Sequence, residues 1–140
     1  MPVTTNWYVP NAVIYTRFSG EPTEDDIVSN SHAINVMVAE SDRPRVHVLT
    51  DFTAVTTATP LAVILRASKF TRPHERIGWV ITIGEQDPVI KLMAKIARQL
   101  VHLKTRGVDT VEDAIDILKS LDDTIDWSQA RGEVLTSGSS

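Results

Sequence analysis

The order in which strand-like and helix-like segments follow one another constrains the fold of this chain more than any other feature. Runs rich in β-branched and aromatic residues alternate with stretches in which apolar residues recur at helical spacing. Strand-like runs lie at residues 7–18, 45–52, 77–84 and 103–108, and helix-like stretches at 23–40, 59–72, 87–102 and 110–121. Strand–helix–strand connections are almost always right-handed, so successive strands become parallel neighbours. The pattern predicts an α/β domain with a mixed sheet of four to five strands and about four helices, packed mainly on one face.

The first strand-like run contains a turn signal. Residues Trp7–Val9 and Ala12–Phe18 are separated by Pro10-Asn11, a pair typical of tight turns. We therefore expect an N-terminal β-hairpin that adds an antiparallel edge to the sheet. The face of the sheet that the helices leave open is a candidate for dimer contact or for a pocket.

Polar residues mark where helices begin. Thr23 as N-cap, with Asp26 three positions later, predicts a capping box, and Asn30 and Asn35 are expected to face water from that helix. Thr59 is expected to cap the second helix, with Pro60 at its first position, where the missing N–H costs nothing.

The chain length of 140 residues fits one domain, which we place at residues 1–126. Residues 127–140 are polar and end in Ser-Gly-Ser-Ser, so they are expected to form a flexible C-terminal tail. Trp127 is the exception, because a large aromatic near a chain end usually docks on its own domain or on a neighbouring subunit.

The composition favours a cytoplasmic protein. There is no cysteine, no apolar run long enough for a membrane span, and no secretion signal at the N-terminus. A net charge of −4 argues against nucleic-acid binding through bulk electrostatics.

Two segments carry a resemblance to a known family. The apolar strand that ends in Asp51-Phe52-Thr53-Ala54-Val55, and the helix start Thr110-Val111-Glu112-Asp113-Ala114, flank the run Gly78–Gly84. In this order and spacing the chain resembles the STAS domain family (sulphate transporter and anti-sigma-factor antagonist), in its SpoIIAA-like branch of small stand-alone bacterial proteins. The resemblance covers about residues 7–121 and implies a non-enzymatic regulatory domain.

The resemblance also implies a phosphorylation switch at the start of the helix after the third strand. The matching loop here is Thr56–Pro60, which lacks the Asp-Ser-Ser-Gly pattern of the well-known regulators. Thr57 and Thr59 are the candidate phosphoacceptors, since amides at a helix N-terminus stabilise a phosphate. The alternative, which N-cap preferences favour, is that Thr59 only caps the helix.

No catalytic motif is present in the sequence. The four histidines, at positions 32, 47, 74 and 102, lie on different predicted elements without metal-ligand spacing, and His47 is interpreted as structural. There is no phosphate-binding loop, nucleophile elbow or dinucleotide fingerprint. We therefore expect no enzymatic activity, no metal and no cofactor.

Two groups of residues are candidates for contact with a partner or ligand. Asp51 and Thr53 lie where a predicted parallel strand ends, which is where α/β sheets place ligand contacts. Lys91, Lys95 and Arg98 share one face of the predicted third helix and form a basic ridge that would attract an anionic partner. The structural alternatives are a loop-capping aspartate and a solvated helix face.

Three hypotheses follow. The first is a regulatory or scaffold domain that binds a protein partner, as a homodimer, through the Asp51–Pro60 segment. The second is a carrier of a small molecule or lipid in a cavity between the sheet and the helices. The third, and weakest, is an enzyme acting near Asp51.

Overall fold

The computed structural model describes residues 3–84, 88, 91–92, 95 and 103–135. The strands are β1 (Val3–Val9), β2 (Val13–Gly20), β3 (Val46–Val55), β4 (Ile77–Ile83) and β5 (Lys104–Val108). The helices are α1 (Glu24–Glu40), α2 (Leu61–Ser68) and α4 (Val111–Leu121), followed by the short 3-10 helices η1 (Trp127–Gln129) and η2 (Gly132–Leu135).

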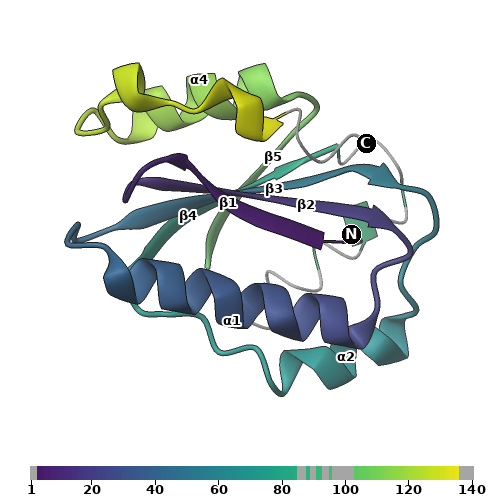
Figure 1. Cartoon of the computed structure of the whole chain (residues 1–140). Coiled ribbons are helices and arrows are strands. Elements are labelled where there is room, and N and C mark those ends of the chain that lie inside the picture. Colours follow the sequence, from purple (N-terminus) through teal and green to yellow (C-terminus); the bar gives the residue numbers. More distant parts are fainter. Residues whose placement is uncertain (1–2, 85–87, 89–90, 93–94, 96–102, 136–140) are drawn as a thin grey trace.

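The strands form one sheet in the order β1-β2-β3-β4-β5, the same as their order in the chain (Figure 1). β1 pairs antiparallel with β2, and the remaining neighbours are parallel. This arrangement confirms the predicted α/β class with a mixed sheet. Between β4 and β5, Pro88, Lys91, Leu92 and Lys95 are helical, whereas most of the helix predicted at 87–102, including Arg98, lies outside the described residues.

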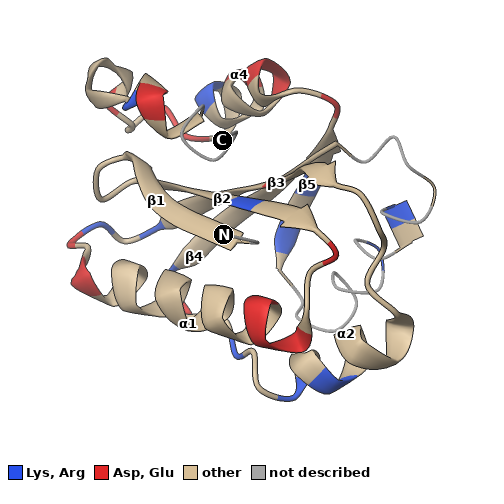
Figure 2. Ribbon diagram, turned by 45° about the vertical axis from the view of Figure 1, so that its right-hand side comes forward, with Lys and Arg blue, Asp and Glu red and all other residues tan. Residues whose placement is uncertain are grey.

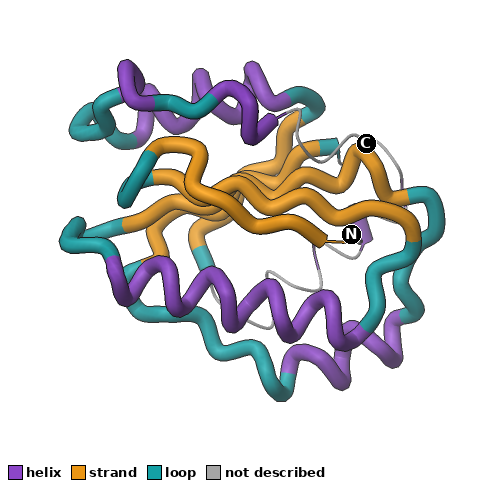
Figure 3. Tube along the Cα trace, viewed as in Figure 1, coloured by secondary structure: helices purple, strands orange, loops and turns teal. Residues whose placement is uncertain are grey.

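Helices cover both faces of the sheet, so the prediction that they pack mainly on one face is wrong. Figures 1 and 3 show α1 and α2 on one face, and α4 with the C-terminal 3-10 helices on the other. α1 and α2 each connect two parallel strands, and right-handed crossovers place them on the same side. α4 follows the last strand, so no crossover constrains it.

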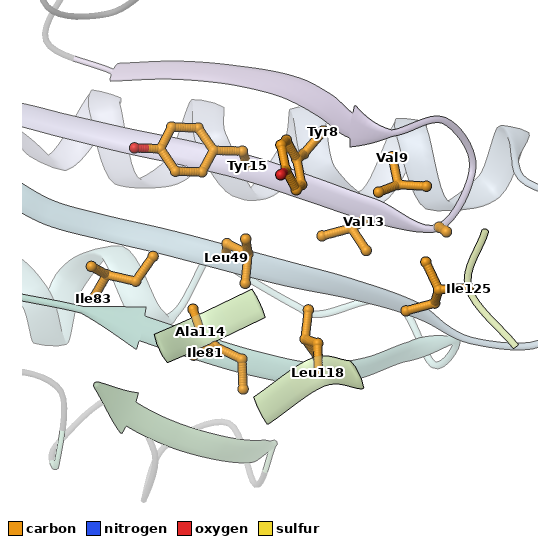
Figure 4. Close-up of a cluster of buried hydrophobic side chains, with 11 residues drawn as sticks. Tyr8, Val9, Val13, Tyr15, Leu49, Ile81, Ile83, Ala114, Leu118 and Ile125 are labelled. Atoms are coloured by element: carbon orange, nitrogen blue, oxygen red, sulfur yellow. The ribbon is translucent and has the colours of Figure 1, made fainter. Parts of the chain in front are cut away.

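The face under α4 is densely filled (Figure 4). Ala114 and Leu118 of α4 are fully buried against Leu49 and Ile81 of the sheet. The C-terminal turns add to this core, with the Trp127 ring centroid 6.3 Å from that of Tyr8. Residues 127–135 thus pack on the domain, which continues past the boundary expected at residue 126.

The start of α1 agrees with the sequence. Thr23 accepts a hydrogen bond from the Asp26 amide (3.1 Å) and its own amide donates to the Asp26 carboxylate (2.8 Å), which is the predicted capping box. Acidic residues cluster at this end of the helix (Figure 2), where they stabilise the helix dipole.

The two asparagines of α1 do not face water as predicted. Asn30 is buried, and its Oδ1 accepts hydrogen bonds from the hydroxyls of Thr5 (2.8 Å) and Thr16 (3.1 Å). Asn35 donates to the Arg72 carbonyl (2.7 Å) and accepts from the His74 amide (2.9 Å). Both residues therefore fasten α1 to neighbouring segments.

Candidate functional site

An apolar cavity of about 260 Å³ lies between the sheet and helices α1 and α2. We call it the apolar cavity. Side chains from the four strands β2 to β5 and from both helices line it, among them Phe18, Val48, Val80, Ile27, Ile34 and Ile64. For comparison, an engineered apolar cavity of about 150 Å³ stays dry and binds benzene. The space is therefore large enough for an organic ligand of more than six carbons.

The apolar cavity runs along the strands. The rings of Phe18 and Phe52 stack at a centroid distance of 5.7 Å and line it near the ends of β2 and β3. At its other limit it reaches Ile77 and Leu103, where β4 and β5 begin. The lining thus extends along the strands as well as across them, from β2 to β5.

Threonines are the main polar residues on the floor of the apolar cavity. Thr50 and Thr82 are direct neighbours in the β3–β4 register, and both line the cavity together with Thr105 of β5. The Thr82 hydroxyl donates to the Arg106 carbonyl at 3.3 Å. The floor thus combines small β-branched side chains with a few hydroxyls, without a charged group among its described residues.

A second space, of about 440 Å³, lies where β3, β4 and β5 begin, and we call it the polar hollow. Its lining includes Arg45, His74, Glu75, Trp79 and Lys104. Pro73, Ile77 and Leu103 line both spaces.

His47, which is buried, and Asp122, which is partly buried, form a pair in the lining of the polar hollow. The Trp79 amide donates to His47 Nδ1 (2.9 Å), so the proton of the neutral ring resides on Nε2, which lies 2.7 Å from Asp122 Oδ2. Both ring nitrogens are engaged, so His47 has no free nitrogen for a substrate. This geometry agrees with the structural interpretation of His47, although its carboxylate partner 75 residues away was not anticipated.

Asp122 is held in its charged form. Burial alone would raise its pKa, but hydrogen bonds from Thr124 and His47 outweigh that effect and lower the pKa to about 2. Asp122 is also the C-cap of α4, and Arg43 lies 3.6 Å from the same carboxylate. The pair therefore fastens the end of α4 to β3 and β4.

Asp51 lies inside β3, because this strand continues to Val55 instead of ending at Phe52. Its side chain is 3% exposed and its carboxylate accepts hydrogen bonds from the Tyr15 hydroxyl, the Thr53 hydroxyl (2.6 Å) and the Thr53 amide (2.8 Å). Tyr15 belongs to the core under α4, on the face opposite the apolar cavity. The structure therefore brings Asp51 and Thr53 together but away from either space.

Burial, and next the hydrogen bond with Asp51, raise the pKa of Tyr15, an effect that nearby Arg17 partly opposes. The phenol therefore remains protonated and donates to the carboxylate across the physiological pH range. Sequence reasoning missed this pairing because Tyr15 and Asp51 are 36 residues apart.

Thr57 and Thr59 differ in access. Thr59 is 4% exposed, and its hydroxyl donates to the Pro22 carbonyl at 2.8 Å. Pro60, not Thr59, is the N-cap of α2, and no side-chain hydrogen bond caps this helix, so the capping prediction for Thr59 is wrong. Thr57 is exposed.

Lys91 and Lys95 are exposed and helical, whereas Arg98, the third residue of the predicted basic ridge, lies outside the described residues.

Every helix in the described ranges is too short or too polar to cross a membrane. Neither a protein-family model nor a curated protein sequence matches the chain.

Proposed function

We propose that this protein binds a small, elongated apolar molecule in the apolar cavity. The observation that carries the proposal is the contrast between the two faces of one sheet. The face under α4 is filled by fully buried side chains, whereas the face under α1 and α2 leaves a partly open space of about 260 Å³. Small-molecule sites are typically concave spaces lined mainly by apolar side chains, and this space has both properties.

The lining supports an apolar ligand. Each methylene group transferred from water into such a space contributes about 0.8 kcal/mol. Threonine hydroxyls are the polar groups of its floor, and the described lining holds no charge that would select an ion. Binding by shape and burial, without bond chemistry, is the activity that this site supports.

Native mass spectrometry of gently purified protein tests the proposal. The unmodified chain is expected to retain a small molecule or to bind an added apolar probe such as 1-octanol. Val80→Trp, which fills the apolar cavity, should abolish this binding. Val111→Trp, the same substitution on the α4 side, should preserve it. Failure of the unmodified chain to bind any apolar probe would reject the proposal.

A second candidate function is the regulatory or scaffold role of a STAS-type domain that binds a protein partner, as a homodimer. Three exposed apolar side chains favour this role. Leu61 (49% exposed) and Leu65 (43%) belong to α2, and Phe70 (62%) follows the end of that helix. Of the two candidate phosphoacceptors in the adjacent loop, Thr57 is exposed, whereas Thr59 is buried.

The combined variant Leu61→Ser and Leu65→Ser tests this second role. It should weaken self-association or partner capture in sedimentation and crosslinking measurements while leaving 1-octanol binding intact. Thr57→Ala should lower cellular phosphorylation of the chain. A monomer with no dependence on either change would count against the regulatory role.

A further inference from the structure

The apolar cavity and the polar hollow share a boundary. Pro73, Ile77 and Leu103 line both spaces, and all three side chains are only half-buried. Ile77 is the first residue of β4, Pro73 lies in the segment before β4, and Leu103 immediately precedes β5. The two spaces therefore adjoin at these three residues, at the edge of the sheet where β4 and β5 begin.

Arg45 and Lys104 give the described lining of the polar hollow two positive charges, beside the carboxylates of Glu75 and Asp122. Arg45 and Lys104 are both exposed. Among the described residues Arg45 donates to the carbonyl of Pro44 (3.0 Å), and Lys104 Nζ lies 5.8 Å from the centroid of the Trp79 ring.

The acidic residues of the polar hollow offset little of this charge. Asp122 is already bound by His47, Thr124 and Arg43. Glu75 is then the one carboxylate of the described lining without an ion pair. Two permanent cations thus face a single unengaged acid in a protein whose net charge is −4.

We propose that the ligand is a single-chain amphiphile with an anionic head. Its tail occupies the apolar cavity, its chain passes Pro73, Ile77 and Leu103, and its head lies in the polar hollow near Arg45 and Lys104. This inference rests on the proposed function, which it deepens by naming the ligand class and the orientation.

The arrangement satisfies the physical demands of such a ligand. The tail transfers apolar surface out of water, whereas the head keeps part of its hydration and avoids the penalty of full burial. Charge-assisted hydrogen bonds from arginine and lysine are the usual partners of carboxylate, sulfate and phosphate groups. A cavity somewhat larger than one that binds benzene suits a tail of medium length.

Calorimetric titration of the full chain with three eight-carbon probes tests the orientation. Octanoate carries an anionic head, 1-octanol a neutral head and octyltrimethylammonium a cationic head. We expect octanoate to bind more tightly than 1-octanol, and the cation to bind most weakly. Arg45→Ala combined with Lys104→Ala should weaken octanoate binding about tenfold while leaving 1-octanol unchanged.

A matched control removes the same amount of charge elsewhere. Lys69 and Arg131 are exposed and line neither space, so Lys69→Ala combined with Arg131→Ala should leave octanoate affinity unchanged. Arg45→Lys combined with Lys104→Arg should restore most of the affinity. Circular dichroism confirms that each variant is folded.

The outcomes separate this inference from the proposed function. Equal affinities for the three probes, or an unchanged octanoate affinity in the Arg45→Ala and Lys104→Ala variant, would overturn the orientation but keep apolar binding. Failure of all three probes to bind the folded, unmodified chain would reject both.

Discussion

The two faces of the sheet are built from the same strands but differ in side-chain size. On the α4 face, β3 and β4 present Leu49, Ile81 and Ile83, which are fully buried. On the α1/α2 face the same strands present Val48, Thr50, Val80 and Thr82. Because strand residues alternate between faces, one set of strands provides a filled core and a cavity floor.

This difference separates stability from binding. Tight packing under α4 stabilises the fold through apolar burial, while shorter β-branched side chains opposite leave room for a ligand. A change on the filled face should therefore affect mainly stability, and a change on the cavity floor mainly binding.

The largest contrast should come from truncating one side chain on each face. Leu118→Ala leaves a new void in the filled core and should cost about 3 kcal/mol of unfolding free energy. Ile64→Ala borders an existing space and should cost about 1 kcal/mol, since less packing is lost. Urea denaturation measures both values, and equal losses would contradict the distinction between the faces.

A smaller loss should follow from Gly78→Ala. An added Cβ would lie 2.6 Å from His47 Nδ1 and 2.7 Å from its Cε1, so the ring must move. The hydrogen bonds of His47 with the Trp79 amide and with Asp122 would then weaken. The attachment of the end of α4 to the sheet would weaken as well, because Asp122 caps that helix. We expect a loss of about 2 kcal/mol. Gly132→Ala, with open space around the added atom, is the control and should have little effect.

The attachment of α4 should also depend on pH. The folded state lowers the pKa of Asp122 from 3.8 to about 2, so its contribution to stability is complete above pH 4 and is lost as the pH falls toward 2. Asp122→Asn should make the decline in stability over this range shallower. Asp123→Asn, at an exposed neighbouring position, should not. Identical pH profiles for the two variants would show that the pair does not act as described.

The smallest effect on stability should come from the threonines. Thr50→Val replaces a hydroxyl on the cavity floor, so it should change stability by less than about 0.5 kcal/mol and tighten 1-octanol binding. Thr16→Val removes a donor to buried Asn30 and should cost about 1 kcal/mol. Denaturation and calorimetry together test the pair, and reversed effects would contradict these roles.

Local features of the fold could be predicted from the sequence. The strand-like runs and the Thr23–Asp26 capping box depend on neighbouring residues, and the structure contains them. The face covered by α4 could not be predicted, because the helix pattern identifies an apolar side but not the surface against which it packs. Right-handed crossovers decide this question only for helices that connect two parallel strands.

The candidate site was harder to predict from the sequence than the fold. A cavity between sheet and helices was only one of three hypotheses, since a void depends on how distant segments pack. The buried environments of Asp51 and Thr59 arise from Tyr15 and Pro22, each more than 30 residues away. A polar residue predicted at a strand end or in a loop can therefore suggest a contact surface, although in the structure it forms a hydrogen bond with a buried group.

Chemical-shift mapping with 1-octanol tests the central claim most directly. Backbone amide resonances of the ¹⁵N-labelled chain are followed during the titration. We predict the largest shifts at Ile34, Val48 and Val80, which line the apolar cavity, and minimal shifts at Ala114 and Leu118 under α4. Shifts concentrated on the α4 side, or no shifts at saturating probe, would contradict the claim that the α1/α2 face is the binding face.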